Sequence, residues 1–508
     1  MSTPIAKELT IEGKEKDGEY SQTSDKTEFV YTIFESKEKF MLIIVLSLVG
    51  FWSTVSSPIY FPALPVLTAY FDTTPSVMNL SVVAYLIFQG IAPTFSSNLA
   101  DSIGRRPIIL ASILIFVAAC IALSQTNVYW LLAVLRCIQA AGIAPVIAIS
   151  SGVAGDVCTP SNRGGFVGQV AGLQLIGNGF GPLIGAALMS SFQTWRSIFI
   201  FLAIGGGVTF ILAFIFLAET SRRIVGNGTI KPKNLLNRAV LIYFPFFKKK
   251  MSNDVSTIVS KRKFDLFGPF KIFFRKKVFL ILLPSGLHFA TWTMSLTLLS
   301  TELESSKYNY SIMHVGLMYL PQGIACFVGS MAIGKSLNWY YKYRKNLYDT
   351  SVEKLPLLDR PAFNLVTTRL TLSIVPAFLM ITGLLIFGWC LQYQQHIVSI
   401  IISTVCISLS ASLMLSICTT LLVDLYPNQG SASASCLNLM RCLIAAVGTG
   451  VLDKMIAKLN LGGTYSLLAG LCLITDLNLI YVLHLETKRL RKDHHQKLNQ
   501  NVKSSDVD

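Results

Sequence analysis

Charged residues inside or beside long apolar stretches are the part of this sequence that could do chemistry. The segment NLADSIGRRP places Asp101, Arg105 and Arg106 close together, with Gly104 between them to permit a tight turn. An acid and two arginines beside helix ends can form ion pairs, or contacts to helix termini, that exist in only one conformation. The spacing predicts a conformational switch, and a topological anchor of positive charge is the alternative.

Two arginines lie deeper in apolar runs. LAVLRCIQAAGIA places Arg136 and Gln139 about one turn apart on one helix face, and Asn438 and Arg441 have the same spacing in a later run. An arginine within a membrane is costly unless it faces a wet cavity or a partner, so each is a functional candidate. The alternative is a structural arginine that donates to carbonyl groups of neighbouring helices.

Proton transfer within the apolar runs would need a buried acid or histidine. Asp476, in LLAGLCLITDLNLIYVL, is the deepest carboxylate, and it either carries a proton or points at a polar neighbour. His288 could titrate near neutral pH, although a lone histidine is more often a packed, hydrogen-bonded residue.

A glycine-rich stretch, GQVAGLQLIGNGFGPLIGAAL, lies within one apolar run. Glycines at intervals of four form a flat helix face that lets a neighbouring helix approach closely in lipid. A proline inside the stretch removes one backbone donor and bends the helix. The stretch therefore predicts a helix that flexes and packs within a moving bundle, and its defining residues are Gly168, Gly177, Gly181, Pro182 and Gly185.

The composition defines the elements that position these residues. The chain has 508 residues, of which 52% are hydrophobic and 14% charged, with a mean hydropathy of +0.56, so it is not a soluble globular protein. Its apolar residues form runs of roughly 20, the length that crosses a bilayer as a helix. We predict an all-α polytopic membrane protein with twelve transmembrane helices, at 40–65, 79–97, 107–124, 128–150, 167–190, 197–218, 278–299, 311–334, 370–391, 397–422, 432–455 and 464–484.

Charge predicts the orientation of these spans. Residues 222–277 carry fifteen Lys/Arg against two acids, which is +13 of the net +16, and predicted loops on the other side are nearly free of basic residues. Because positive loops stay in the cytoplasm, both termini and this linker are expected there. The basic linker is interpreted as topological, with binding of anionic lipid as the alternative. Nucleic-acid binding is not expected, since topology accounts for the charge.

The spans divide into two related halves. Asp156 in GDVCTPSNRGG follows span four as Asp424 in VDLYPNQGSAS follows span ten, each with a proline soon after. Weak similarity between parallel halves is typical of two helical bundles about a central cavity. The expected parts are a cytoplasmic tail at 1–39, a six-helix bundle at 40–221 (the first half), a basic linker at 222–277, a six-helix bundle at 278–485 (the second half) and a cytoplasmic tail at 486–508.

Other classes lack their signatures in this sequence. The ten cysteines lie in or beside the spans without clustering, so neither a disulfide framework nor a metal site is suggested. No nucleophile motif occurs. GSMAIGKS at 329–336 fits the GxxxxGK[ST] pattern, but it lies at the end of the apolar run 311–334 and does not follow a strand, so an enzyme, an ATP-driven pump and a bound cofactor are not expected. No cleavable secretory signal precedes the first span.

With these residues in view, the chain resembles the major facilitator superfamily, and within it the fungal twelve-span drug:proton antiporters of the quinidine-resistance branch. The segment 98–107 is similar to the superfamily's loop-two/three signature, 132–144 to its span-four arginine motif and 168–186 to the span-five motif typical of exporters. SPIYFPALP at 57–65 and AETSRRIVGNGTIKP at 218–232 resemble the branch. The resemblance implies two six-helix bundles and a midplane cavity that opens alternately to each side.

The resemblance also implies roles for single residues. Asp101, Arg105 and Arg106 would form the charge cluster of an inner gate, with Asp156 and Arg163 as partners. Arg136 would take part in proton coupling, and the glycine-proline stretch would form the span-five hinge.

Two departures from the family pattern affect these roles. Asn338 stands where the signature of the second half would have an acid, so this gate loop lacks its charge and the halves are not expected to switch by identical contacts. The first span has no carboxylate, where several relatives keep one for the proton. Asp476 and Asp101 are therefore candidates for the proton-carrying acid.

Substrate recognition would use aromatic walls and a few polar groups. Each candidate for the lining has ordinary packing as its alternative. The candidates are Trp52, Tyr60, Tyr85, Gln89, Gln139, Trp292, Tyr319, Gln322, Asn438 and Arg441.

The leading hypothesis is a proton-coupled exporter of drugs and other small organic compounds in a fungal plasma membrane. Its expected partners are the substrate, protons and membrane lipids, and its expected state is monomeric. A vacuolar or spore membrane is the alternative location. Alternative cargoes are an amino acid derivative, a monocarboxylate, a polyamine or a spore-wall precursor. A transporter-like sensor without net transport is the hypothesis from another class.

Overall fold

All twelve predicted runs fall on helices. The computed structural model describes residues 32–232, 234–239, 268–304, 308, 310–353, 361–426 and 429–505. Among these residues, eleven helical segments are long and apolar enough to span a membrane. The last of them contains two runs, because Asn460 has non-helical dihedral angles (φ 58°, ψ 177°) that separate one helix from the next. The tail at 1–31 and much of the predicted linker, at 240–267, lie outside the described residues.

The helices of the first half include several that together make one span. Prolines explain some of the interruptions, since a proline nitrogen has no proton to donate: Pro58 begins η1, and Pro145 begins α6 directly after α5. The elements are α1 (Ser36–Val55), η1 (Pro58–Ala63), α2 (Leu64–Tyr70), α3 (Pro75–Ile103), α4 (Arg105–Ser124), α5 (Tyr129–Ile143), α6 (Pro145–Val157), α7 (Pro160–Leu175), α8 (Gly177–Phe192) and α9 (Arg196–Phe216).

The helices of the second half follow two short elements of the linker, α10 (Arg222–Val225) and η2 (Leu235–Asn237). The predicted C-terminal tail continues the last helix as far as Ser505. The elements are α12 (Gly268–Phe273), α13 (Lys276–Glu304), α14 (Ile312–Met318), α15 (Leu320–Val352), α16 (Leu365–Leu370), η6 (Thr371–Ser373), α17 (Ile374–Gln392), α18 (Ile397–Leu425) and α19 (Gly430–Ser505).

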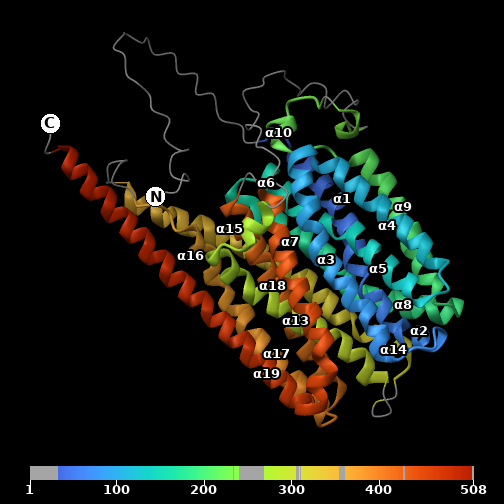
Figure 1. The fold of residues 1–508 in the computed structure, drawn as a ribbon. Coiled ribbons are helices and arrows are strands. Elements are labelled where there is room, and N and C mark those ends of the chain that lie inside the picture. Colours follow the sequence, from blue (N-terminus) through green and yellow to red (C-terminus); the bar gives the residue numbers. More distant parts are fainter. Residues whose placement is uncertain are drawn as a thin grey trace. The chain divides into compact units, whose positions relative to one another are not determined.

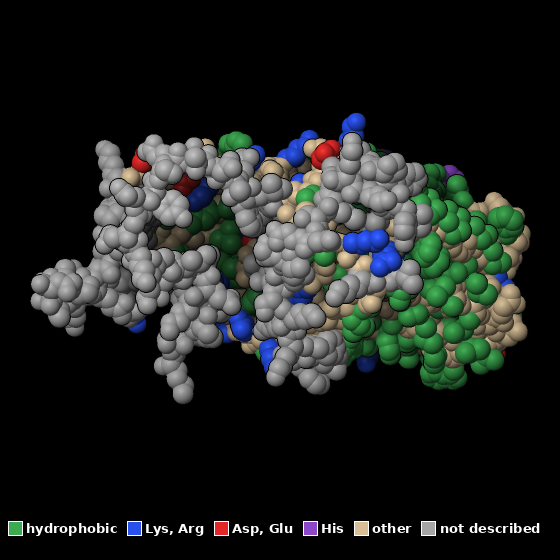
Figure 2. All heavy atoms as spheres, turned by 90° about the horizontal axis from the view of Figure 1, so that it is seen from above, with side chains coloured by type: hydrophobic (Ala, Val, Ile, Leu, Met, Phe, Trp, Pro, Cys, Tyr) green, Lys and Arg blue, Asp and Glu red, His purple; other side chains and the backbone are tan. Residues whose placement is uncertain are grey.

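Two helix pairs join the halves along their length. α3 packs against α19, and α7 packs against α15 (Figure 1). Large hydrophobic side chains such as Ile204, Phe378 and Val447 remain more than 60% exposed, and hydrophobic side chains cover the flank of the bundle seen in Figure 2. In water such a surface would be unfavourable, whereas in a bilayer it contacts lipid.

One end of the bundle gathers the charged segments predicted from the sequence. We call it the basic end, and Figure 2 looks onto it. Five segments meet at the basic end, and hydrogen bonds connect them to one another. They are the turn between α3 and α4, the junction of α6 and α7, the segment that follows α9, helix α16, and the junction of α18 and α19.

Candidate functional site

The first charge cluster at the basic end joins α3, α4 and α6. Arg105 donates from Nη1 to Oδ1 of Asp101 (2.7 Å) and from Nε to Oδ2 of Asp156 (2.5 Å). All three side chains are at most 6% exposed. The predicted gate residues Asp101, Arg105 and Asp156 therefore lie together, and Arg105 pairs with both acids.

The same cluster reaches the second half at the start of α19. Arg105 donates to Oγ of Ser431, and Oδ2 of Asp101 accepts from the backbone N–H of Ala432 (3.2 Å). A carboxylate near the first N–H groups of a helix is favoured by the helix dipole. These contacts exist only while α3 and α19 are close at the basic end.

Glu219 supports this cluster and was not among the predicted site residues. Its carboxylate accepts from the backbone N–H groups of Arg105 (3.0 Å) and Arg106 (3.2 Å), and so caps the start of α4. Burial raises the pKa of the Glu219 carboxyl, which the same N–H donors oppose. Gly104 (φ 129°) is required beside it, because a Cβ there would lie 2.5 Å from Oε2 of Glu219.

Arg106 has a different environment from Arg105. It donates to the backbone oxygens of Phe214 (2.6 Å), Leu236 (2.8 Å) and Arg238 (2.5 Å). Its hydrogen bonds fix the end of α9 and the described part of the linker. Arg106, which was predicted as a gate residue, is therefore bound to backbone carbonyl oxygens in the structure.

A second charge cluster lies beside the first and belongs mainly to the second half. Asp424 at the end of α18 pairs with Arg369 of α16 (Nε–Oδ2 2.9 Å) and with Arg163 of α7, and the Asp424 side chain is 1% exposed. Arg369 also donates to the backbone oxygen of Pro160 at the start of α7 (2.8 Å). This cluster ties the second half to the first.

The second cluster changes two expectations. Arg163 was expected beside Asp101, yet its ion pair is with Asp424, 261 positions away. The second half was expected to lack gate charge because of Asn338, but Asp424 and Arg369 supply it, and Asn338 donates to the backbone oxygen of Asn162 (3.4 Å). The two clusters are not identical, since in the first Arg105 pairs with two acids and in the second Asp424 pairs with two arginines.

Arg136 lies inside the first half, fully buried. Its guanidinium stacks between the rings of Tyr60 and Tyr85, at 4.2 Å from each centroid, and donates to the backbone oxygen of Ser56 (3.0 Å) and Oε1 of Gln139 (2.9 Å). No acid among the described residues forms an ion pair with it. Tyr60, Tyr85 and Gln139, predicted as substrate lining, thus surround this arginine.

The glycine-proline stretch has two faces with different neighbours. Gly177, Gly181 and Gly185 lie against α1 and η1 of the same half, and a Cβ on Gly181 would be 3.1 Å from Cγ of Pro58. Gly168 instead faces α15 of the second half, where a Cβ would lie 2.5 Å from the Ser330 oxygen. Only glycine allows both close approaches.

Replacing Gly185 with alanine is expected to impair the protein, because the added Cβ would clash with the backbone oxygen of Ile59, which cannot rotate away. Overpacking of this kind costs about 1–3 kcal/mol. The matched control is Gly207→Ala on α9, where a Cβ meets nothing within 4 Å. Thermal unfolding in detergent should show a lower midpoint for the first variant only, and equal midpoints would mean that η1 shifts freely.

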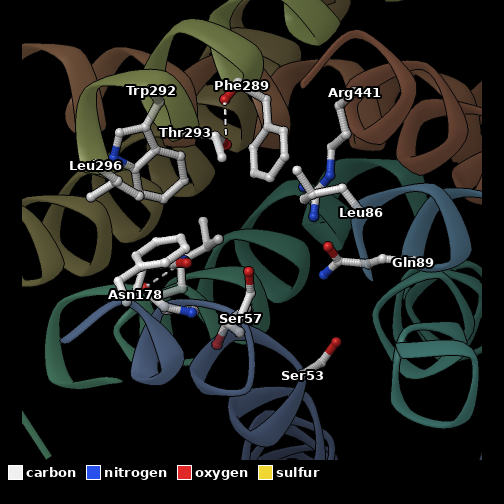
Figure 3. Close-up of a pocket in the computed structure, with 14 residues that line it drawn as sticks. Ser53, Ser57, Leu86, Gln89, Asn178, Phe289, Trp292, Thr293, Leu296 and Arg441 are labelled. Atoms are coloured by element: carbon white, nitrogen blue, oxygen red, sulfur yellow. Dashed lines mark hydrogen bonds between the residues drawn. The ribbon is translucent and has the colours of Figure 1, made fainter. Parts of the chain in front are cut away.

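A small cavity lies between the halves near the middle of the spans. Figure 3 shows Phe289, Trp292 and Arg441 extending into it from the second half toward residues of the first. The fourteen lining residues are Ser53, Thr54, Ser57, Pro58, Phe61, Leu86, Gln89, Leu175, Asn178, Phe289, Trp292, Thr293, Leu296 and Arg441.

Arg441 is the one charged side chain in that lining. It is 3% exposed, its guanidinium lies 4.4 Å from the ring centroid of Phe289, and its Nε has no hydrogen-bond partner. A second small cavity shares Thr54, Leu175 and Arg441 with the first. Arg441 therefore stands where the two cavities meet.

Some of the predicted lining residues line the cavity, and the others lie elsewhere. Gln89, Trp292 and Arg441 line the cavity. Asn438 donates to the backbone oxygen of Gln89 (2.6 Å) and so joins α19 to α3 beside it. The remaining residues do not line it: Trp52 donates to Oγ1 of Thr209 (2.7 Å), Tyr319 to the backbone oxygen of Leu296 (2.6 Å), and Gln322 is buried on α15.

Asp476 has a partner that the sequence did not identify. Its Oδ2 lies 3.1 Å from Nε2 of His288, across the contact between α19 and α13. Within the described part of the chain, no group of three or more His, Cys, Asp or Glu could hold a metal ion.

The helices are long and apolar enough to span a membrane, they surround a central cavity, and ion pairs tie the two halves together at one end. This architecture is that of a membrane transporter. The model of the Major Facilitator Superfamily matches residues 42–449, and the chain belongs to this family. The predicted fold class, a helical multi-pass membrane protein with the major facilitator fold, is confirmed.

Relatives place the chain within the family. It is 71% identical to the MFS antiporter QDR1 of Candida albicans, over 94% of both chains. It is 38% identical to Quinidine resistance protein 1 of Saccharomyces cerevisiae, over 89% of this chain and 84% of that protein. The crystal structure of the human organic anion transporter MFSD10 has a similar fold, with a TM-score of 0.63 at 14% identity, over 87% of this chain and 99% of that one. The predicted resemblance to the quinidine-resistance branch is confirmed.

Proposed function

We propose that this protein is a proton-coupled exporter of small organic compounds that works by alternating access. The observation that carries the proposal is the pair of charge clusters at the basic end, which join the halves on one side of a central cavity. Opening that side requires the contacts of Asp101 and Arg105 to α19, and of Arg163 and Arg369 to the opposite half, to break together.

The charge distribution supports an orientation. The segments that flank the basic end hold most of the chain's excess Lys and Arg, so this end faces the cytoplasm and both termini are cytoplasmic. The structure is then closed to the cytoplasm. We further propose a plasma-membrane location and a monomeric state, with a six-helix bundle on each side of the linker.

Transport into vesicles tests the proposal. The full-length protein is reconstituted, the lumen is acidified, and labelled quinidine is added, because one relative is named for resistance to it. Accumulation is expected to exceed that in protein-free vesicles, which report passive trapping, and to end when a protonophore collapses the gradient. Accumulation that ignores this collapse would show that proton coupling is wrong.

A second candidate cargo is a solute that carries a carboxylate. Arg441 favours it, because the cavity lining contains this one cation and no acid. A buried guanidinium without a counter-charge is unfavourable, and a bound carboxylate would neutralise it. Phe289 and Trp292 beside it would contact an apolar body.

The charge preference of the cavity can be measured on purified protein. The probes are 3-phenylpropionate and 3-phenylpropylamine, which differ mainly in charge, and Trp292 in the lining allows binding to be followed by tryptophan fluorescence. The acid is expected to bind about tenfold more tightly than the amine. Arg441→Gln should remove this preference, whereas Arg196→Gln, away from the cavity, should keep it. Equal or tighter binding of the amine by the unaltered protein would exclude the carboxylate cargo.

A further inference from the structure

A histidine and a carboxylate are paired deep inside the second half, away from both charge clusters. His288 on α13 is 0% exposed and Asp476 on α19 is 8% exposed. Nε2 of His288 lies 3.1 Å from Oδ2 of Asp476, and Nδ1 lies 3.1 Å from Oγ of Ser410 on α18. The imidazole therefore connects three helices.

The hydrogen bonds of Ser410 fix one proton of the imidazole. Its Oγ lies 2.6 Å from the backbone oxygen of Pro376, and a carbonyl oxygen only accepts, so the hydroxyl proton points there. A hydroxyl has one proton, and Oγ must therefore accept from His288. Nδ1 of His288 carries that hydrogen.

The contact between His288 and Asp476 needs a second proton. With a hydrogen on Nδ1, Nε2 of a neutral imidazole is an acceptor, and a carboxylate is also an acceptor. The 3.1 Å contact is a hydrogen bond only if Nε2 is protonated beside a carboxylate or if Asp476 is protonated beside a neutral imidazole. Either form is neutral overall, and loss of that proton leaves one negative charge in an apolar interior.

The surroundings offer little to stabilise that negative charge. Among the described residues, no lysine or arginine forms an ion pair with Asp476, and its Oδ1 has no hydrogen-bond partner. The other titratable side chains near it are the thiols of Cys418 on α18 and Cys472 on α19. α17 contributes Pro376 and Met380, which do not titrate.

We infer that His288 and Asp476 together form the proton-binding site of this transporter, an inference that rests on the proposed proton-coupled function. One proton binds between Nε2 and Oδ2 from one side of the membrane and leaves to the other, and no other bond is made or broken. The site places a buried acid inside the second half, whereas Asp101 is engaged in the gate cluster.

The position of the pair explains how a proton could act on the cargo. The cavity is lined by three neighbours of His288 on α13, namely Phe289, Trp292 and Thr293. The guanidinium of Arg441 packs against the ring of Phe289. The bound proton ties α13 to α19, and its loss removes that tie. Loading and unloading the proton therefore change the freedom of a helix that forms the cavity wall.

The test separates proton coupling from substrate movement. Asp476→Asn keeps the shape and offers an N–H donor to Nε2, so it mimics the loaded site permanently. In vesicles, it is expected to lose accumulation of labelled quinidine driven by a pH gradient, while keeping exchange of labelled for unlabelled quinidine at equal pH. The matched control is Asp453→Asn, an exposed acid in the part of α19 that precedes Asn460, which should keep both activities. Gradient-driven accumulation by Asp476→Asn, or loss of exchange together with it, would overturn the inference.

A second measurement does not depend on transport. Infrared spectra of the unaltered protein, recorded while pH is raised, should show imidazole and carboxyl bands changing in one step, because one proton is shared. Asp476→Asn should abolish this step, and Asp453→Asn should retain it. A step that persists in Asp476→Asn would assign the proton elsewhere. If the unaltered protein shows the step but no gradient-driven transport, the proposed function fails and the proton site stands.

Discussion

Replacing Asp424 with asparagine is expected to abolish net export and to open the basic end. Its carboxylate is 1% exposed and shared by Arg163 of α7 and Arg369 of α16. Without it, two buried guanidinium groups face each other with no carboxylate between them. Removing one partner of a buried ion pair typically costs about 3–5 kcal/mol, so the substitution should strongly destabilise the closed arrangement.

Opening of the basic end can be followed by labelling. Ser151 lines the second cavity, so a cysteine introduced there should react with a water-soluble maleimide faster when Asp424 is replaced. The matched control is Asp349→Asn, since Asp349 pairs with Lys345 on the surface, where both side chains are more than 40% exposed. Surface pairs contribute little, so this variant should label and transport like the unaltered protein. Unchanged labelling in Asp424→Asn would mean that the second cluster does not hold the gate.

Stretches of hydropathy sufficed to predict the helices, because every span had to be apolar along its length. Local spacing also sufficed for one pair of the first cluster, since Asp101 and Arg105 are one turn apart and pair directly. The partner of Arg163 could not be found in this way. Asp424 is 261 positions away, and only the packing of α7 against α18 brings the two together.

The function of a buried polar residue depends on neighbours from other helices. From the sequence His288 could titrate or be a packed, hydrogen-bonded residue, and its partner Asp476 lies 188 positions away in sequence and 3.1 Å away in the structure. Tyr60 and Tyr85 fit an aromatic substrate site by composition, but both rings hold Arg136. Glu219 had a local signal, since it follows span six in AETSRR beside the basic linker, and its role as a helix cap depends on Gly104.

Arg136 is the second residue whose loss should stop transport. Its donor bond to the backbone oxygen of Ser56 lies where α1 ends and the first span bends toward η1. Ser53, Ser57 and Pro58 on either side of that bend line the cavity. Arg136 therefore positions this wall of the cavity without lining it, by its hydrogen bond to Ser56 and its contact with the ring of Tyr60.

Arg136→Ala is expected to abolish gradient-driven export while the protein still reaches the membrane, because the helices remain apolar and the lost contacts are internal to the first half. The variant leaves the Ser56 oxygen without its donor and a void between Tyr60 and Tyr85, and large-to-small changes in a core typically cost about 2–5 kcal/mol.

Arg136→Lys should recover part of the export, since an ammonium group can donate to Ser56 but cannot stack between two rings. Arg196→Ala is the control, since that arginine donates to Oδ1 of Asn127 (2.6 Å), away from the cavity. Membrane abundance and efflux measured together decide the matter: normal efflux by Arg136→Ala would reduce Arg136 to a packing residue, and the bend of the first span would then be held by its prolines alone.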